Sequence, residues 1–297
     1  MPAVFARRSM KRLLPALIVI AALGLGATLA LLAVSGVAAS LPDVSSLAQR
    51  IPTRTALMRQ RFAEARRAGR APRLEQRWVP YAAISPLLRR AVLIAEDDAF
   101  FSHDGLDWNE IRASVKRDVE ARRIVRGGST ITQQLARNLY LGQERTVTRK
   151  LREILLAGRI ERALPKRRIF EIYLNVIEWG DGIYGVEAAA WHHFGVPASQ
   201  LDARRSALLA AVIINPRRYD PVRPARRIER RARMILGRML RRGFVSEVDY
   251  RAALGLPPPA IPAESTGSAP ADSASAAPAA PPAPQATPTA EPDSLPR

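Results

Sequence analysis

The sequence predicts a mainly α-helical protein that follows a single membrane-spanning helix. The first observation is the stretch 13–41, which has no charged residue and exceeds the roughly 20 apolar residues that cross a hydrocarbon core. The second is a helical spacing of apolar residues between positions 78 and 254. Because we find no convincing alternation of strand residues there, the predicted class is all-α, or α with minor β.

Composition narrows the range of partners. The 297 residues contain no cysteine, which excludes a disulfide framework and a cysteine-ligated metal. The net charge of +19 favours binding to a negatively charged partner, and nucleic acid, anionic lipid and pyrophosphate all qualify. A coding preference for arginine is an alternative explanation of the excess.

The flanks of the apolar stretch predict its orientation. Four basic residues precede it: Arg7, Arg8, Lys11 and Arg12. By the positive-inside rule they hold residues 1–12 in the cytoplasm and place the rest of the chain outside, which argues against nucleic acid as a partner. The alternative is a cleaved signal peptide with a small-residue site at 37–39, although a signal's apolar region spans only about 7–15 residues.

The remaining chain divides into three parts. Residues 42–75 are polar and arginine-rich and are interpreted as a juxtamembrane connection, with some helix through 59–69. Residues 76–254 form the predicted folded domain. Residues 257–297 hold half of the chain's 24 prolines and too little apolar bulk to offset their ordering entropy, which predicts a disordered tail.

Seven helices are expected in the domain. Ser85 and Pro86 supply an N-cap and a first-turn proline for one of them. Pro165 ends another, for which we predict a buried stripe of Leu151, Ile154 and Leu155. Two of the expected helices begin at Pro86 and near 129–130. The other five cover 148–163, 167–177, 186–194, 203–214 and 224–242. The last is interpreted either as a core-packing helix with a basic outer face or as one resting on anionic lipid.

An acidic cluster lies where the helix from Pro86 should end. Glu96, Asp97 and Asp98 oppose the negative end of the helix dipole, a cost that indicates a role. One carboxylate could act as a general base. The alternative is a solvated acidic turn in which His103 caps the helix.

Two further clusters carry polar and cationic side chains. Gly127 and Gly128, before Ser129 and Thr130, would present free backbone N–H groups to a phosphate, and the alternative is a plain N-cap. Helical spacing places Thr130, Gln134 and Arg137 on one face. Arg149 and Lys150 share a face with Glu153, either as a surface ion pair worth about 0.3–0.5 kcal/mol or as a site for a pyrophosphate leaving group.

Together these blocks resemble the glycosyltransferase family 51 domain, the peptidoglycan transglycosylase, over residues 78–240. The patterns Glu-Asp-x-x-Phe-x-x-His-x-Gly from 96, Gly-x-Ser-Thr-Ile-x-Gln-Gln from 127 and Arg-Lys-x-x-Glu from 149 are specific as a set. The stretch 180–189 is similar to the monofunctional biosynthetic branch. The resemblance implies a lysozyme-like helical fold with a membrane-embedded jaw.

The resemblance also implies an activity and a location. The expected reaction polymerises lipid II into β-1,4 glycan strands and releases undecaprenyl diphosphate. The expected place is the cell inner membrane, with a cytoplasmic N-terminus and a periplasmic catalytic domain. Expected partners are lipid II, the growing lipid-linked glycan, the membrane and candidate cell-wall synthesis or division proteins, and no nucleic acid.

Residue roles are carried over with the resemblance. Glu96 would be the general base and Glu153 a second acid that organises charge around the departing diphosphate. The implied substrate-binding residues are Asp97, Phe100, His103, Ser129, Thr130, Gln134, Arg137, Arg149 and Lys150. Arg137 stands where the family usually has lysine, which keeps the charge but changes its geometry. A divalent cation, magnesium or manganese, could help to stabilise the departing diphosphate, and its ligands are unknown. No organic cofactor is expected.

Two alternatives stay open at this point. A lysozyme-like enzyme that cleaves glycan would need an acid to protonate a sugar oxygen and would have no use for the cations at 137, 149 and 150. A non-catalytic membrane scaffold would need neither carboxylate.

Overall fold

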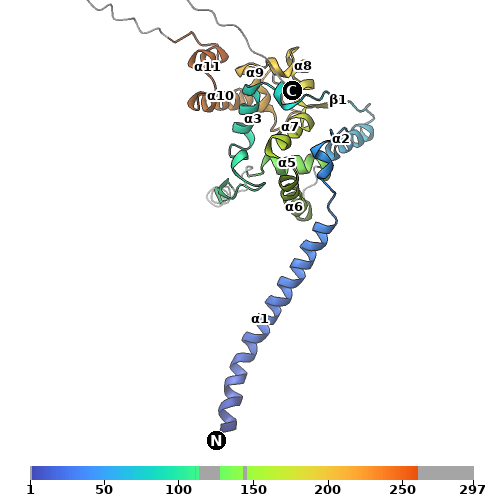
Figure 1. Ribbon diagram of the computed structural model, residues 1–297, viewed down its shortest axis with the longest axis vertical. Coiled ribbons are helices and arrows are strands. Elements are labelled where there is room, and N and C mark those ends of the chain that lie inside the picture. Colours follow the sequence, from blue (N-terminus) through green and yellow to red (C-terminus); the bar gives the residue numbers. More distant parts are fainter. Residues whose placement is uncertain (1, 111, 114–127, 143–145, 260–297) are drawn as a thin grey trace, which may run out of the picture. The chain divides into compact units, whose positions relative to one another are not determined.

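The computed structural model describes residues 2–110, 112–113, 128–142 and 146–259, with side chains from Ile18 onward (Figure 1). The predicted tail therefore lies almost wholly outside the described residues, and so does Gly127 of the glycine pair. Within the described ranges the protein is mainly helical, which confirms the predicted class.

The N-terminal helix α1 spans Pro2–Ala39. Its segment Ile18–Ala39 has 22 residues with a mean hydropathy of 2.4, and none of its most apolar stretch is buried against the rest of the protein. It is the one helix among the described residues that is long and apolar enough to cross a membrane. The single N-terminal apolar helix predicted from sequence is thus present.

Nine further α-helices lie among the described residues. In chain order they are α2 Ala56–Arg67, α3 Pro86–Glu96, α5 Ile131–Ala136, α6 Val147–Ala163, α7 Lys166–Val176, α8 Val186–Phe194, α9 Ala203–Val212, α10 Arg226–Arg241 and α11 Glu247–Ala253. Short helical turns connect them: η1 Ser45–Ala48, η2 Tyr81–Ala83, η3 Phe100–Ser102, η5 Ala198–Gln200 and a π-helical turn, η4, at Arg137–Leu141.

The core forms where two sets of helices pack. Helix α9 lies against α3 and α10, and helix α5 lies against α6 and α7 (Figure 1). Helix α10 buries one apolar side and turns most of its arginines outward, so it is the core-packing helix of the two alternatives above. Its buried residues are Ile228, Ala232, Ile235, Leu236 and Met239. These contacts bring the end of α3 and the start of α5 toward α10 and α6.

A small sheet accounts for the minor β content. Strands β1 (Glu75–Gln76) and β3 (Ile183–Tyr184) are parallel, and β2 (Glu178–Gly180) pairs antiparallel with β3, in the order β1-β3-β2. Gly185 follows β3 with a φ of +81°, and a Cβ at this position would lie 2.6 Å from the carbonyl oxygen of Asn175. Only glycine therefore fits this turn between the sheet and α8.

Most predicted helices are found within two or three residues of their expected bounds. Pro86 occupies the first turn of α3, but the Ser85 hydroxyl donates to the carbonyl oxygen of Leu201 (2.8 Å) instead of capping the helix. The stripe predicted for α6 is wrong: Leu151, Ile154 and Leu155 are all only partly buried, although Leu155 packs against the core. The buried residues of α6 are Glu153, Leu156, Ala157 and Ile160. Apolarity alone selected the wrong face because the ion pairs of Glu153 bring a charged residue inside.

Candidate active site

Glu96 is the last residue of α3 and its side chain is only 12% exposed. Its Oε1 accepts a hydrogen bond from Nη2 of Arg231 (3.0 Å), and its Oε2 accepts one from Nε2 of Gln134 (3.1 Å). Burial raises the pKa of Glu96 above its ordinary value, while Arg231, Gln134 and Arg137 act against that rise. A carboxylate with a raised pKa is suited to accept a proton near neutral pH.

Asp97 stabilises the loop that follows Glu96 through hydrogen bonds to Ile131 and His103. It is buried, and its Oδ2 accepts from the backbone N–H of Ile131 at the start of α5 (2.9 Å). Nε2 of His103 lies 3.0 Å from Oδ1 of Asp97, and Nδ1 of His103 accepts from the N–H of Gly105 (3.2 Å), so the ring proton sits on Nε2. His103 thus pairs with Asp97 and does not cap α3. Phe100 is fully buried beside them.

The start of α5 is held by Thr130, and α5 carries the side chain of Gln134 to Glu96. The Thr130 hydroxyl accepts from the N–H of Gln133 (3.2 Å) and donates to the carbonyl oxygen of Gly105 (2.7 Å). The Gln134 amide donates to Glu96 and, more weakly, to the carbonyl oxygen of Ser129 (3.4 Å). Its Oε1 accepts from the hydroxyl of Tyr173 (3.0 Å), which fixes the amide orientation.

Glu153 of α6 is fully buried and is paired with two cations. Nζ of Lys150 lies 2.6 Å from its Oε1, and Nη1 of Arg149 binds its Oε2. Nζ of Lys150 also donates to the Ser129 hydroxyl (3.2 Å) and to Oε1 of Gln133 (3.3 Å). Each oxygen of Glu153 thus binds one cation, which holds the side chains of Lys150 and Arg149 in place.

Ser129 joins the acidic and the cationic halves of the site. Its carbonyl oxygen accepts from Gln134, the hydrogen-bond partner of Glu96, and its hydroxyl accepts from Lys150, the partner of Glu153. A continuous path of hydrogen bonds therefore runs from the predicted base to the predicted leaving-group cations. The structure brings these residues together across the junction of α3, α5 and α6.

Arg137 follows α5 at the start of the π-helical turn η4. Its positive charge acts on both Glu96 and Tyr173, which places it near the same site. Its buried Nε has no hydrogen-bond partner among the described residues. A buried guanidinium N–H without a partner carries a desolvation cost that an anionic ligand would remove.

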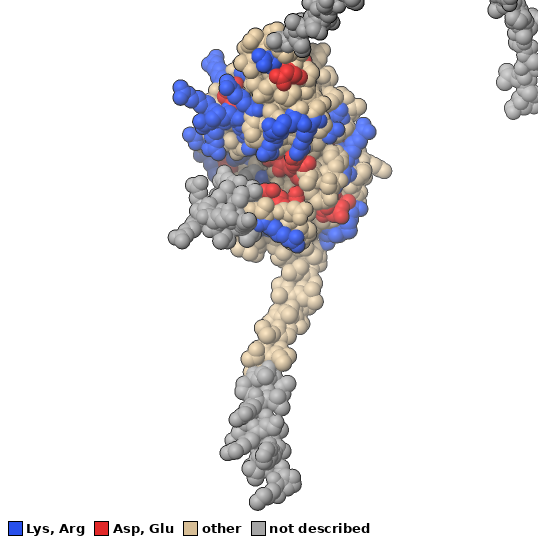
Figure 2. Space-filling model, turned by 90° about the vertical axis from the view of Figure 1, so that its left-hand side faces the viewer, with Lys and Arg blue, Asp and Glu red and all other residues tan. Residues whose placement is uncertain are grey.

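A cavity of about 390 Å³ adjoins Glu96 between the end of α3 and the start of α5. Its polar lining residues are Glu96, Asp97, Asp98, Asp107, Glu110, Ser129, Thr130 and Arg238. Figure 2 shows acidic side chains gathered near the middle of this face of the domain, below a band of Lys and Arg. The acid-lined side suits a neutral sugar hydroxyl, and the cations around Glu153 suit a diphosphate.

Sequence reasoning missed Arg231 and Tyr173. Arg231 belongs to α10, where it is one of many arginines, and its 24% exposure sets it apart only once the fold is known. Tyr173 is fully buried in α7, and its hydroxyl reaches Gln134. A lone polar atom on an otherwise apolar face of the helix 167–177 is the sequence signal that could have indicated Tyr173.

The described residues do not fit a resident metal ion. No group of three or more His, Cys, Asp or Glu side chains suited to hold one is found among them. The two oxygens of Glu153 are already bound by Lys150 and Arg149. We therefore derive no chemical step through a protein-bound cation.

A family model described as Transglycosylase matches residues 64–240, more than half of the chain. The chain belongs to the transglycosylase family. As a transglycosylase it has similar curated relatives, each named biosynthetic peptidoglycan transglycosylase. The one from Nitrosomonas eutropha is 50% identical over 188 residues, which covers 63% of this chain and 77% of the relative. Those from Laribacter hongkongensis and Methylobacillus flagellatus are each 47% identical over 188 residues, with 63% of this chain and 82% of each relative covered.

The residues described above lie within or beside the matched range of this transglycosylase. The match includes Glu96, Glu153 and Arg231, and it ends in the last turn of α10. The roles assigned to the individual site residues are predictions.

Proposed function

We propose that this transglycosylase is a peptidoglycan glycosyltransferase that polymerises lipid II into β-1,4 glycan strands and releases undecaprenyl diphosphate. The observation that carries the proposal is the hydrogen-bond path between Glu96 and the cation pair on Glu153. A base on one side and cations on the other are what sugar transfer from a diphosphate requires.

Glu96 supplies the base. In its ionised form it takes the proton of the acceptor's 4-hydroxyl as that oxygen forms a bond to the donor's anomeric carbon. Gln134 and Arg231 hold one carboxylate oxygen each, which fixes the direction of the remaining lone pairs. This fixed orientation reduces the entropy lost on reaching the transition state.

The cations receive the leaving group. As the bond from the anomeric carbon to the phosphate oxygen breaks, its electron pair moves to the diphosphate. Lys150, Arg149 and Arg137 are the nearest candidates to stabilise that charge, and Lys150 is 42% exposed and thus accessible to a ligand. A diphosphate already leaves easily, so no protonating acid is required.

Membrane anchoring fits this substrate. The apolar helix Ile18–Ala39 would hold the domain beside a lipid-linked donor and acceptor, which raises their encounter frequency. We infer single-pass insertion in the inner membrane, with the N-terminus in the cytoplasm and the domain in the periplasm. Reaction of single engineered cysteines before and after the helix with a membrane-impermeant reagent tests this orientation.

A divalent cation would arrive with the substrate. Because the described residues do not fit a resident site, magnesium or manganese would enter bound to the donor's diphosphate. Polymerisation measured across a titration of each metal, with a chelator as the zero point, tests this part of the proposal. Association with cell-wall synthesis or division proteins is a further expectation, tested by cross-linking in cells.

The deciding experiment uses the purified full chain. Incubation with lipid II should yield long glycan, and incubation with preformed glycan should yield no new reducing ends. A lysozyme-like enzyme would give the opposite pair of results. A scaffold would give neither product, and its cellular role would survive replacement of Glu96 by Gln.

A further inference from the structure

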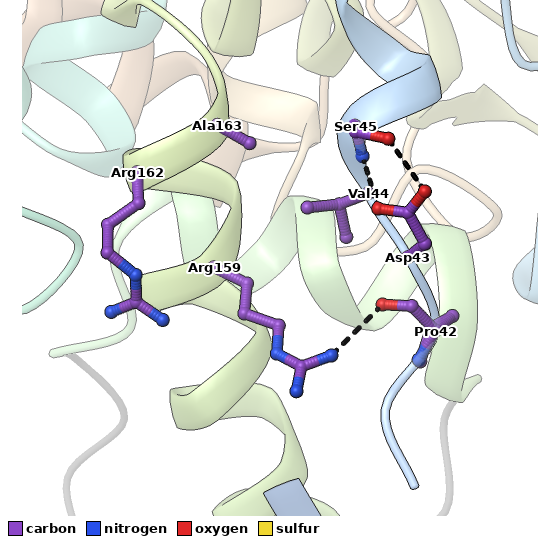
Figure 3. A pocket seen from close by; sticks show the side chains of 7 residues that line it. All are labelled: Pro42, Asp43, Val44, Ser45, Arg159, Arg162 and Ala163. Atoms are coloured by element: carbon purple, nitrogen blue, oxygen red, sulfur yellow. Dashed lines mark hydrogen bonds between the residues drawn. The ribbon is translucent and has the colours of Figure 1, made fainter. Parts of the chain in front are cut away.

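A second cavity lies at the opposite end of α6 from the cation pair. Its volume is about 310 Å³, within the range of about 300–1,000 Å³ typical of small-ligand sites. One wall is the segment 42–45, which follows α1, and the other is the last turns of α6 (Figure 3). Its charged lining residues are Asp43, Arg159 and Arg162. The transglycosylase chemistry described above uses none of them.

Arg159 fixes the depth of this cavity relative to α1. Its guanidinium donates to the carbonyl oxygens of Ala38 (2.6 Å) and Leu41 (3.0 Å). Ala38 lies in the last turn of α1 and Leu41 lies two residues after its end at Ala39, so Arg159 ties α6 to the C-terminal end of α1. Because the apolar segment ends at Ala39, the end of α1 lies where hydrocarbon gives way to lipid headgroups if α1 spans the bilayer. The cavity therefore opens at headgroup depth.

Arg162 offers an uncommitted cation there. Its side chain is exposed and runs back along α6, so that Nη1 lies near Gly158, and Figure 3 shows its guanidinium across α6 from the segment 42–45, with that of Arg159 between them. Among the described residues we find no hydrogen bond or ion pair to Arg162. A guanidinium presents a planar fork of N–H donors that matches a phosphate.

Asp43 provides an opposite charge on the facing wall. Its Oδ1 accepts from the N–H of Ser45 (2.9 Å) and its Oδ2 accepts from the Ser45 hydroxyl (2.6 Å), which orients the carboxylate (Figure 3). The same two hydrogen bonds lower the pKa of Asp43, so the group is ionised at neutral pH. A fixed carboxylate would repel a simple anion, and it favours a ligand that carries a cation beside its phosphate.

We propose that this cavity binds the headgroup of a phospholipid that carries a primary ammonium group, such as phosphatidylethanolamine. The phosphate contacts Arg162, with Arg159 adding positive charge, and the ammonium donates to Asp43. The site would fix the height and rotation of the domain at the membrane surface through a lipid instead of through more protein. It rests on α1 spanning the bilayer and not on the polymerisation chemistry.

The test measures which lipids the full chain retains. The protein is reconstituted into nanodiscs of equal phosphatidylethanolamine, phosphatidylglycerol and phosphatidylcholine, released into detergent, and analysed by native mass spectrometry. We expect several-fold enrichment of phosphatidylethanolamine over both other lipids. Asp43→Asn should remove that preference, and Arg162→Ala should lower retention of all phospholipids. Excess inorganic phosphate should not displace the lipid.

Matched variants keep the test decisive. Arg230→Ala removes another exposed arginine, from α10, and should retain lipid like the unchanged protein. Glu96→Gln should do the same, which separates this site from the proposed function. Thermal unfolding of each variant checks that the fold persists. Preference for phosphatidylglycerol, displacement by inorganic phosphate alone, or equal retention by Arg162→Ala and Arg230→Ala would each overturn the proposal.

Discussion

The carboxylate of Glu96 and the guanidinium of Arg231 meet from two different helices, α3 and α10, with 3.0 Å between Oε1 and Nη2. The same Nη2 donates to the carbonyl oxygen of Ala95 (3.0 Å). Arg231 thus holds both the end of α3 and the predicted base. Helix α10 therefore contributes to the site as well as to the core.

Replacing the base should stop the reaction without unfolding the protein. Glu96→Gln keeps an acceptor for Arg231 but cannot take a proton, so polymerisation of lipid II should fall by about 10²–10⁴-fold. The matched control is Glu178→Gln, which alters another carboxylate whose pKa burial raises and which also pairs with an arginine, Arg61, at 3.1 Å. If both variants lose activity equally while both stay folded, Glu96 is not the base.

The pH profile should report the pKa of Glu96. The rate requires the ionised form, so kcat/KM should fall as the pH drops through a pKa that burial has raised. Arg231→Gln removes a positive charge that opposes this rise, and the acidic limb should therefore move to higher pH. Arg230→Gln, on the neighbouring exposed side chain, should leave the limb in place. An Arg231→Gln enzyme that is slower at every pH, with an unmoved limb, would indicate a purely structural role.

Removal of the buried carboxylate of Glu153 should cost stability as well as activity. Glu153→Gln leaves Arg149 and Lys150 without their counter-charge, and we expect roughly 3 kcal/mol of lost unfolding free energy, at the low end for a broken buried pair because Lys150 reaches solvent. Glu247→Gln breaks an i,i+4 pair of the same spacing on the surface and should cost about 0.5 kcal/mol or less. Urea unfolding measures both, and equal losses would show that the buried network contributes little.

Arg137, which stands where the family usually has lysine, should contact the diphosphate as a lysine would. Arg137→Lys should keep kcat/KM within a few-fold, since a charge remains near the cleft. Arg137→Ala should lower it by about 10²-fold, as loss of a transition-state donor does. Steady-state rates with lipid II, on variants with matched melting temperatures, provide the measurement. Full activity of the alanine variant would exclude this guanidinium from the reaction.

The turn before α8 should tolerate no side chain. Gly185→Ala adds a Cβ 2.6 Å from the carbonyl oxygen of Asn175 at a positive φ, so it combines backbone strain with a steric clash. Gly195→Ala has a similar φ of +66° but open space around it, and should cost only about 1–2 kcal/mol. Thermal unfolding should rank Gly185→Ala clearly lower. Equal melting temperatures would mean that the clash relaxes freely.

Sequence reasoning located what is encoded locally. Prolines, caps and glycines mark helix ends within a few residues, and so α8 was predicted at the bounds the structure has, ending at Gly195. The acids at 96–97 and the cations at 149–150 were predicted because each cluster is contiguous in the sequence. The short pairings of β1 with β3 join residues more than a hundred positions apart, and two-residue strands carry no periodic signal.

The part of the site that sequence could not predict depends on tertiary pairing. Helical spacing puts Arg231 beside the apolar side that Ile228 and Ile235 form, but only the packing of α10 on α3 shows that it reaches Glu96. The buried face of α6 was misjudged because hydropathy assigns Glu153 to the surface. In both cases an ion pair formed on folding outweighs the intrinsic preference of one residue for water.

The charge on Glu153 also affects the rate at which the enzyme releases the diphosphate product. The carboxylate neutralises one of the two positive charges of Arg149 and Lys150, so the pair attracts a departing diphosphate with about one net charge. An unopposed pair would hold that product more tightly and slow its release. The weaker electrostatic attraction allows the polyprenyl carrier to diffuse away and the next donor to enter. Turnover then depends on product release as much as on bond formation.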